Sequence, residues 1–79
     1  MKITYDPKYN IAYIQLREKG QDIETLKISD ELNIDVAPDG KIYGIELLNA
    51  NEQLDVIKNR PLTFLNEQTQ QTFELPIAL

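Results

Sequence analysis

Alternating apolar and polar positions dominate the first 48 residues of the chain, and a period of two is typical of β-strands with one buried face. Turn-forming residues interrupt the alternation at short intervals, which divides the segment into strands joined by tight turns. The pattern therefore predicts an antiparallel β-meander of about five strands. The expected strands are residues 1–5, 11–17, 22–28, 32–36 and 41–48.

The segment 41–48 differs from the other expected strands because it is apolar on both faces. A strand of this kind is usually central in its sheet or covered on its second face. Gly44 lies in the middle of it, and a glycine inside a strand often marks a close approach by another part of the protein. We expect a short helix or a second subunit to cross the strand at Gly44.

A short helix is predicted directly after this strand. Asn49 is a suitable N-cap residue, and Glu52 follows three residues later, as in a capping box. Leu54 and Ile57 have helical spacing, so the helix is expected over residues 52–59. A helix of this length needs packing against the sheet to be stable.

The segment 61–79 carries two β-prone runs, 62–65 and 72–75, on either side of a polar stretch. They predict a C-terminal hairpin or an extended arm, and a helix over residues 66–73 is the alternative. Apolar residues continue to the end of the sequence, and apolar termini tend to pack against something, such as a second subunit. The segment is therefore a candidate oligomerisation tail.

Length and composition point to a partner as a source of stability. A chain of 79 residues is near the lower limit for a self-sufficient core, and it has no cysteine or histidine for disulfides or a Cys/His zinc site. We expect one small β-rich α+β domain over residues 1–79 that forms a homo-oligomer or docks onto another protein. The lack of cysteine and of any long apolar run fits a cytoplasmic protein without a membrane partner.

The charge pattern bears on the kind of partner. The net charge is −5, from 13 acidic and 8 basic residues, and the cations are scattered. We expect no nucleic-acid partner, because phosphate binding requires clustered cations. An acidic surface favours solubility or a small basic protein partner. The tyrosines have no basic residues interleaved with them, so packing or protein contacts, rather than base stacking, are their expected role.

No catalytic, cofactor or metal site is predicted. Without histidine a nucleophile lacks its usual base, and Ser29, the only serine, lies in an expected turn. Asp35 and Asp39 do not provide the ligand number of a calcium loop. Glu46 stands out because it lies on an otherwise apolar strand. A small-ligand-binding or carboxylate-based enzyme-like domain using Glu46 and Asp6 is therefore the alternative to a protein-interaction domain.

The candidate functional or interface residues are aromatic and polar side chains on the expected strands, at the helix start and in the tail. They are Tyr5, Asp6, Tyr13, Tyr43, Glu46, Asn49, Phe64 and Phe73.

Two blocks of residues carry a family resemblance. They are Thr4-Tyr5-Asp6-Pro7 with Asn10 and Ala12-Tyr13-Ile14-x-Leu16, and Asp39-Gly40-x-Ile42-x-Gly44-Ile45-Glu46-x-Leu48-Asn49-Ala50. In order and spacing the chain resembles the small prokaryotic proteins of the DUF2283 family, a domain of unknown function, over residues 1 to about 50. Asn10 departs from the family, whose members often carry aspartate there, and the segment after Ala50 does not match.

The resemblance implies a stand-alone β-rich domain without an established activity. Some members of the family are encoded beside small toxin-like proteins, which implies an antitoxin-like partner role for such domains.

Overall fold

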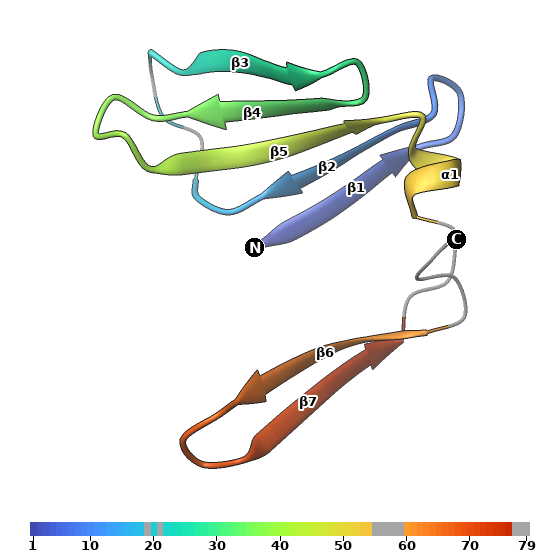
Figure 1. Ribbon diagram of the computed structural model, residues 1–79, viewed down its shortest axis with the longest axis vertical. Helices are drawn as coiled ribbons and strands as arrows, with labels where there is room; N and C mark the ends of the chain where they lie inside the picture. Colours follow the sequence, from blue (N-terminus) through green and yellow to red (C-terminus); the bar gives the residue numbers. More distant parts are fainter. Residues whose placement is uncertain (19, 21, 55–59, 77–79) are drawn as a thin grey trace.

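The computed structural model describes residues 1–18, 20, 22–54 and 60–76 (Figure 1). The elements in this part of the chain are β1 (Lys2–Asp6), β2 (Ile11–Gln15), β3 (Glu24–Ser29), β4 (Leu32–Val36), β5 (Ile42–Leu48), α1 (Ala50–Gln53), β6 (Pro61–Asn66) and β7 (Gln71–Pro76). The first five strands form an antiparallel sheet, and β6 and β7 form a separate hairpin. The predicted α+β class, with mostly β structure, is confirmed.

The five-stranded sheet has the strand order β1-β2-β5-β4-β3. It combines the β1–β2 hairpin with the β3–β4–β5 meander, and β5 joins the two by pairing with both β2 and β4. The central place of β5 confirms the prediction made from its apolar pattern. Alternation assigns side chains to faces but does not identify the neighbouring strand, so the β2–β5 pairing could not be read from the sequence.

The strand register divides the sheet into two faces, because residues paired across antiparallel strands share a face. Tyr13 pairs with Thr4 and Glu46, and Glu46 pairs with Asn33, so these four residues belong to what we call the polar face. The opposite side we call the apolar face. Its residues are Ile3, Tyr5, Ala12, Ile14, Leu26, Leu32, Ile34, Ile45 and Leu47.

Two turns form where the sequence predicts them. Asp6 begins an Asx-turn after β1, in which its Oδ1 accepts a hydrogen bond from the Lys8 amide at 2.9 Å. Before β5, Gly40 has a φ of 83°, and its amide donates to the Ala37 carbonyl at 2.9 Å. A glycine adopts this left-handed conformation without steric penalty, which explains its place in the hairpin.

Helix α1 begins directly after Asn49, the residue predicted as its N-cap, and two residues before the range predicted from the apolar spacing. The expected helix covered residues 52–59, whereas α1 spans Ala50–Gln53 and residues 55–59 lie outside the described part of the chain. The predicted capping box is wrong, because Asn49 has a left-handed backbone (φ 51°, ψ 45°) and its side chain makes no hydrogen bond to the helix backbone. The Asn49 Nδ2 donates instead to the Glu52 carboxylate at 2.8 Å.

The C-terminal segment adopts the first of the structures predicted for it. β6 and β7 pair in continuous register from Pro61↔Pro76 to Asn66↔Gln71, which confirms the hairpin and rules out both the extended arm and a helix over 66–73. Asn66 organises the turn, because its Oδ1 accepts hydrogen bonds from two turn amides at 3.0 and 3.3 Å. Every residue of both strands is exposed.

The buried apolar core is small. Among the described residues it consists of Ala12, Tyr43 and Ala50. The chain has an accessible area of 6397 Å², whereas a compact monomer of its 9.1 kDa mass exposes about 4,900 Å². About 1,500 Å² of additional surface therefore remains in contact with solvent.

Gly44 makes room for the Tyr13 ring on the neighbouring strand. A Cβ atom at residue 44 would lie 2.5 Å from Tyr13 Cζ and 2.7 Å from its Cε1, which is closer than such atoms approach in proteins. The close approach predicted at Gly44 is thus present. The expectation of a helix or subunit at this point is wrong, because the space is taken by a side chain of β2.

Gly44→Ala should therefore destabilise the protein by about 2 kcal/mol, because the new methyl group overpacks against the Tyr13 ring. Chemical denaturation measures the change in the free energy of unfolding. Gly20→Ala is the matched control, since no atom of the described residues beyond its chain neighbours lies within 4 Å of the place that a Cβ would take, and it should change stability by less than about 0.5 kcal/mol. Equal effects of the two substitutions would contradict the steric explanation.

Candidate functional site

A hydrogen-bonded network crosses the polar face from β2 to β3. The Tyr13 hydroxyl donates to Asp35 Oδ2 at 2.6 Å, and the Thr25 hydroxyl donates to Asp35 Oδ1 at 2.6 Å. Beside them, Asn33 Nδ2 donates to Glu46 Oε1 at 2.9 Å. Both carboxylates therefore accept hydrogen bonds from neutral donors on other strands, and Tyr13 reaches across β5 to do so. The network ties together four of the five strands.

Tyr13 is a fixed donor in this network. Burial raises the pKa of Tyr13 well above its usual range, and the hydrogen bond to Asp35 and the negative charges of Asp35 and Glu46 raise it further. The phenol consequently stays protonated over the physiological pH range. This is the arrangement of a structural hydrogen bond rather than of a general base.

The structure does not bring Asp6 and Glu46 together. Asp6 lies opposite Ile11, whereas Glu46 lies opposite Tyr13, so the two carboxylate-bearing residues are two strands and two residues apart, which is roughly 12 Å. Asp6 is also engaged in its own turn. Within the described ranges, no group of three acidic side chains is close enough to hold a metal ion.

A second polar cluster lies where the β1–β2 turn meets α1. Asn10 Oδ1 accepts from the Asn51 amide at 2.7 Å, and Asn10 Nδ2 donates to the side-chain oxygens of Asn51 at 2.6 Å and Asn49 at 3.2 Å. Asn10 and Asn49 both have positive φ values, 58° and 51°, which asparagine tolerates better than most residues. The Asn10 side chain thus accepts a hydrogen bond from a backbone amide at the start of α1, which is the role predicted for Asn49.

The same cluster reaches the β3–β4 turn through Glu31. Asn49 Nδ2 donates to Glu31 Oε1 at 3.1 Å, and Gln53 Nε2 donates to the Glu31 carbonyl at 2.9 Å. The sequence singled out Asn49, but it did not indicate the roles of Glu31 and Gln53, because their partners are distant in sequence. The amides of this corner are used in internal hydrogen bonds, so its chemistry is that of a structural junction.

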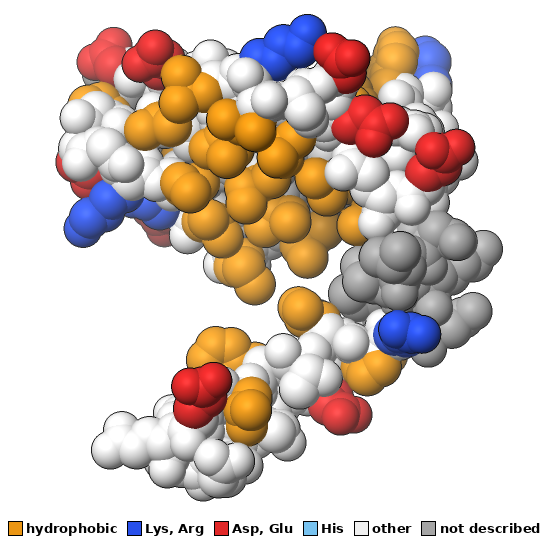
Figure 2. Space-filling view, in the orientation of Figure 1, with side chains coloured by type: hydrophobic (Ala, Val, Ile, Leu, Met, Phe, Trp, Pro, Cys, Tyr) orange, Lys and Arg blue, Asp and Glu red, His pale blue; other side chains and the backbone are white. Residues whose placement is uncertain are grey.

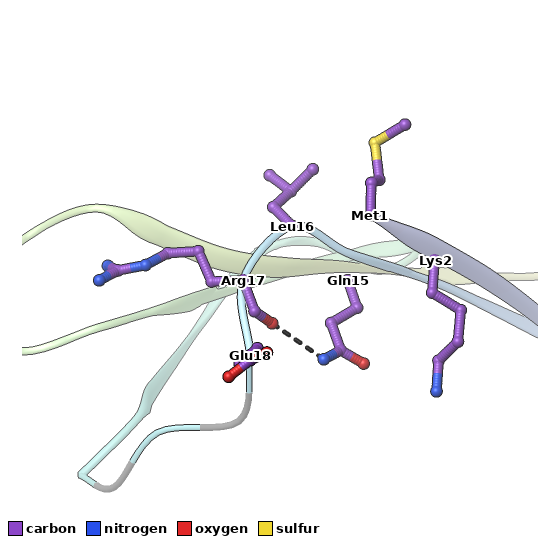
Figure 3. A pocket seen from close by; sticks show the side chains of 6 residues that line it. All are labelled: Met1, Lys2, Gln15, Leu16, Arg17 and Glu18. Carbon is purple, nitrogen blue, oxygen red and sulfur yellow. Dashed lines mark hydrogen bonds between the residues drawn. The ribbon is translucent and has the colours of Figure 1, made fainter.

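The hollow surfaces of the described part do not form a converging site. One, of about 280 Å³, is lined by the start of β1 and the end of β2 (Figure 3). Its hydrogen bond, from Gln15 Nε2 to the Arg17 carbonyl at 2.9 Å, is local, and Lys2 and Glu18 lie apart from each other. A second hollow, of about 300 Å³, lies beside the exposed 3.0 Å ion pair between Arg17 and Asp39.

The aromatic candidates fall into three environments. Tyr13 belongs to the polar network, whereas Tyr43 is buried and Tyr5 lies half-buried on the apolar face. Phe64 and Phe73 face each other across the hairpin and are 66% and 70% exposed. The tyrosines therefore do not form one stacking surface.

The apolar face is the largest unusual feature of the surface. Figure 2 shows apolar side chains gathered in a broad area over the five-stranded sheet, with both acidic and basic side chains around its edge. On the two edge strands, Ile3 is 45% exposed and Leu26 is 41% exposed. Helix α1 packs at the end of the sheet against β2, and no other described element covers this face. Open apolar areas of this kind are rare on monomeric proteins.

Comparison with known proteins identifies the family but not an activity. The chain matches the family described as "Protein of unknown function (DUF2283)" over residues 2–51, and it belongs to that family. The match confirms the resemblance seen in the two sequence blocks. No curated protein and no solved structure matched the chain. In the part of the chain that the structure describes, no helix has the length and apolar character needed to cross a membrane.

Replacing Asn10 tests the junction at α1. Asn10→Gly keeps the left-handed backbone accessible but removes the side-chain hydrogen bonds, so it should lower the free energy of unfolding by about 1–2 kcal/mol. Asn10→Ala should cost about 1 kcal/mol more, because alanine is strained at positive φ. Chemical denaturation of the three proteins measures both effects. A glycine variant as stable as the parent would show that only backbone conformation matters at this position.

The raised pKa of Tyr13 predicts a loss of stability at alkaline pH. Tyrosine in the unfolded chain ionises near pH 10, whereas folded Tyr13 holds its proton to higher pH. Its contribution to stability is therefore complete below about pH 10 and is lost progressively as the pH rises above that value. Denaturation curves between pH 8 and pH 11 should show this decline, and Tyr13→Phe should reduce its slope. An unchanged slope in the variant would contradict the assignment.

Proposed function

We propose that this protein is a small protein-interaction domain that forms homo-oligomers through the apolar face of its five-stranded sheet. The observation that carries the proposal is the exposure of this face in a chain with a very small core. Apolar patches larger than a few hundred Å² are rare on monomeric proteins and mark contact sites. A second copy is the partner that the size of the chain favours, because oligomerisation supplies the buried area that a single small domain lacks.

The accessible area supports an extensive interface. The chain exposes about 1,500 Å² beyond what a compact monomer of its mass would. Permanent homodimers bury about 1,000–2,500 Å² on each partner, whereas standard transient complexes bury about 800 Å². The excess therefore corresponds to a permanent assembly.

A small basic protein is the second candidate partner, as in an antitoxin-like role. The net charge of −5 favours it. The native mass of the protein, purified gently from its own cells, distinguishes the candidates. A mass equal to a multiple of 9.1 kDa supports self-association, and a mixed complex supports the basic partner.

The enzyme-like alternative has less support. It requires Asp6 and Glu46 to act on one ligand, and their strand positions keep them roughly 12 Å apart. Each carboxylate is also engaged by a donor of the fold, Asp6 by the Lys8 amide and Glu46 by Asn33.

Two neighbouring residues of β1 provide a matched test of the proposed surface. Ile3 lies on the apolar face and Thr4 on the polar face, and both are exposed in the single chain. Ile3→Asp should raise the dissociation constant of the oligomer about 10- to 100-fold, because it buries a charge at the interface. Thr4→Asp adds the same charge and should leave the oligomer intact.

Sedimentation velocity over a concentration series measures both variants, and far-ultraviolet circular dichroism checks that each remains folded. A parent chain that stays a 9.1 kDa monomer at every concentration would contradict self-association. Equal weakening by the two substitutions would show that the contact does not use the apolar face.

A further inference from the structure

The hairpin β6–β7 presents a second apolar surface on the same chain. We infer that the hairpin of one copy packs this surface on the apolar face of a second copy, in a reciprocal exchange that forms a dimer. The inference rests on the proposed self-association and specifies the segment that makes the contact. It is carried by the register, exposure and chemistry of the hairpin, by its place beside the sheet and by the area left uncovered.

The hairpin register places its four apolar contact residues on one face. Leu62 pairs with Leu75, and Phe64 pairs with Phe73. Because side chains two residues apart in a strand share a face, these two pairs lie next to each other and form a continuous apolar strip. The opposite face carries the pairs Thr63–Glu74 and Leu65–Thr72, so it is the more polar of the two faces although it includes Leu65.

This strip has no packing partner among the described residues of its own chain. Every residue of β6 and β7 is exposed, and the two strands contact chiefly each other. An isolated two-stranded hairpin is at best marginally stable in water and needs to pack on another apolar surface. Two phenylalanines with exposures of 66% and 70% therefore mark an incomplete surface.

A second copy is a better occupant than the hairpin's own sheet. Figure 1 shows the hairpin beyond the β1 edge rather than over a face of the sheet. In this arrangement Ile3, on β1 itself, is still 45% exposed, and Figure 2 shows the apolar area of the sheet uncovered. A two-fold exchange covers both apolar surfaces of both chains with one kind of contact, which is the usual logic of symmetric dimers.

The chemistry of the two surfaces is complementary. The apolar face consists mainly of isoleucine and leucine on a twisted sheet, and the hairpin provides two aromatic rings as anchors. Aromatic side chains inserted among aliphatic ones are typical contact centres of interfaces. Each chain would lose two exposed surfaces on dimerisation, in agreement with its excess of about 1,500 Å².

The sequence offers a specific experiment, because its only two phenylalanines are those of the hairpin. One sample of the full-length protein is deuterated except at phenylalanine, and a second is deuterated except at the isoleucine methyl groups. The samples are mixed, unfolded in urea and refolded together. Nuclear Overhauser effects between phenylalanine rings and isoleucine methyls can then arise only between different chains.

We expect nuclear Overhauser effects between the phenylalanine rings of one chain and the isoleucine methyl groups on the apolar face of the other. They should arise in a species with the mass of a dimer. Ring-to-methyl effects seen only when both labels are in one chain would show that the hairpin packs on its own sheet and would overturn the inference. A dimer without ring-to-methyl effects would overturn it as well, while leaving self-association through the sheets standing. A monomer would overturn both the inference and the proposed function.

A pair of substitutions gives an independent measure. Phe64→Ala with Phe73→Ala removes the aromatic anchors and should raise the dimer dissociation constant at least 100-fold. Thr63→Ala with Thr72→Ala truncates the opposite face of the same hairpin and should change it less than threefold. Similar values for the two double variants, measured by sedimentation equilibrium, would overturn the inference.

Discussion

The structure depends on the pairing of β5 with β2 on one side and β4 on the other. These two ladders join a hairpin and a meander that would otherwise be separate, and the two-stranded hairpin alone would be at best marginally stable. Joining them produces a sheet that is one layer thick. A single layer has two faces, and the short helix α1 covers only one end of it. Because the sheet is a single layer that α1 covers only at one end, one face carries the polar network and the other remains an open apolar face.

The polar face of the sheet is covered and hydrogen-bonded by side chains of the chain itself. Tyr13 lies across Gly44, and its hydroxyl reaches Asp35, so one aromatic side chain covers the position on β5 that has no side chain of its own. The apolar face has no such internal solution in the described residues. In the proposed dimer a second copy would cover this face, and the hairpin is the apolar element that the chain itself provides for that contact.

Much of the fold was readable from the sequence because local patterns determine it. The alternation of apolar residues located five strands to within a few residues, and Gly40 marked a turn that requires its conformation. The strand order was not readable, since it depends on contacts between distant residues. Asn49 was correctly placed before the helix, but its left-handed backbone and its contacts with Asn10 and Glu31 were not readable, because these partners are distant in sequence.

For the candidate residues too, the sequence indicated the strand positions but not the contacts between distant residues. Glu46 was recognised as unusual from its strand position, and Tyr13 was a candidate residue, but their partners were not identified. Asn33, the partner of Glu46, lies on the next strand of the same meander, whereas Asp35, the partner of Tyr13, lies beyond β5. Asp6 and Glu46 belong to strands that the topology separates, so their proximity could not be judged from alternation. Phe64 and Phe73 were singled out as apolar residues in the tail, and the hairpin register explains why they form one surface.

The donors of the polar network have a consequence for the protein's response to salt. Asp35 and Glu46 are held by tyrosine, threonine and asparagine, none of which carries a charge. Dissolved ions screen attractions between opposite charges but act little on hydrogen bonds from neutral groups. The cohesion of this face is therefore largely independent of ionic strength, and burial of the apolar surfaces is strengthened by salts that are excluded from proteins. The two faces of the sheet thus combine to favour a fold that tolerates concentrated electrolytes.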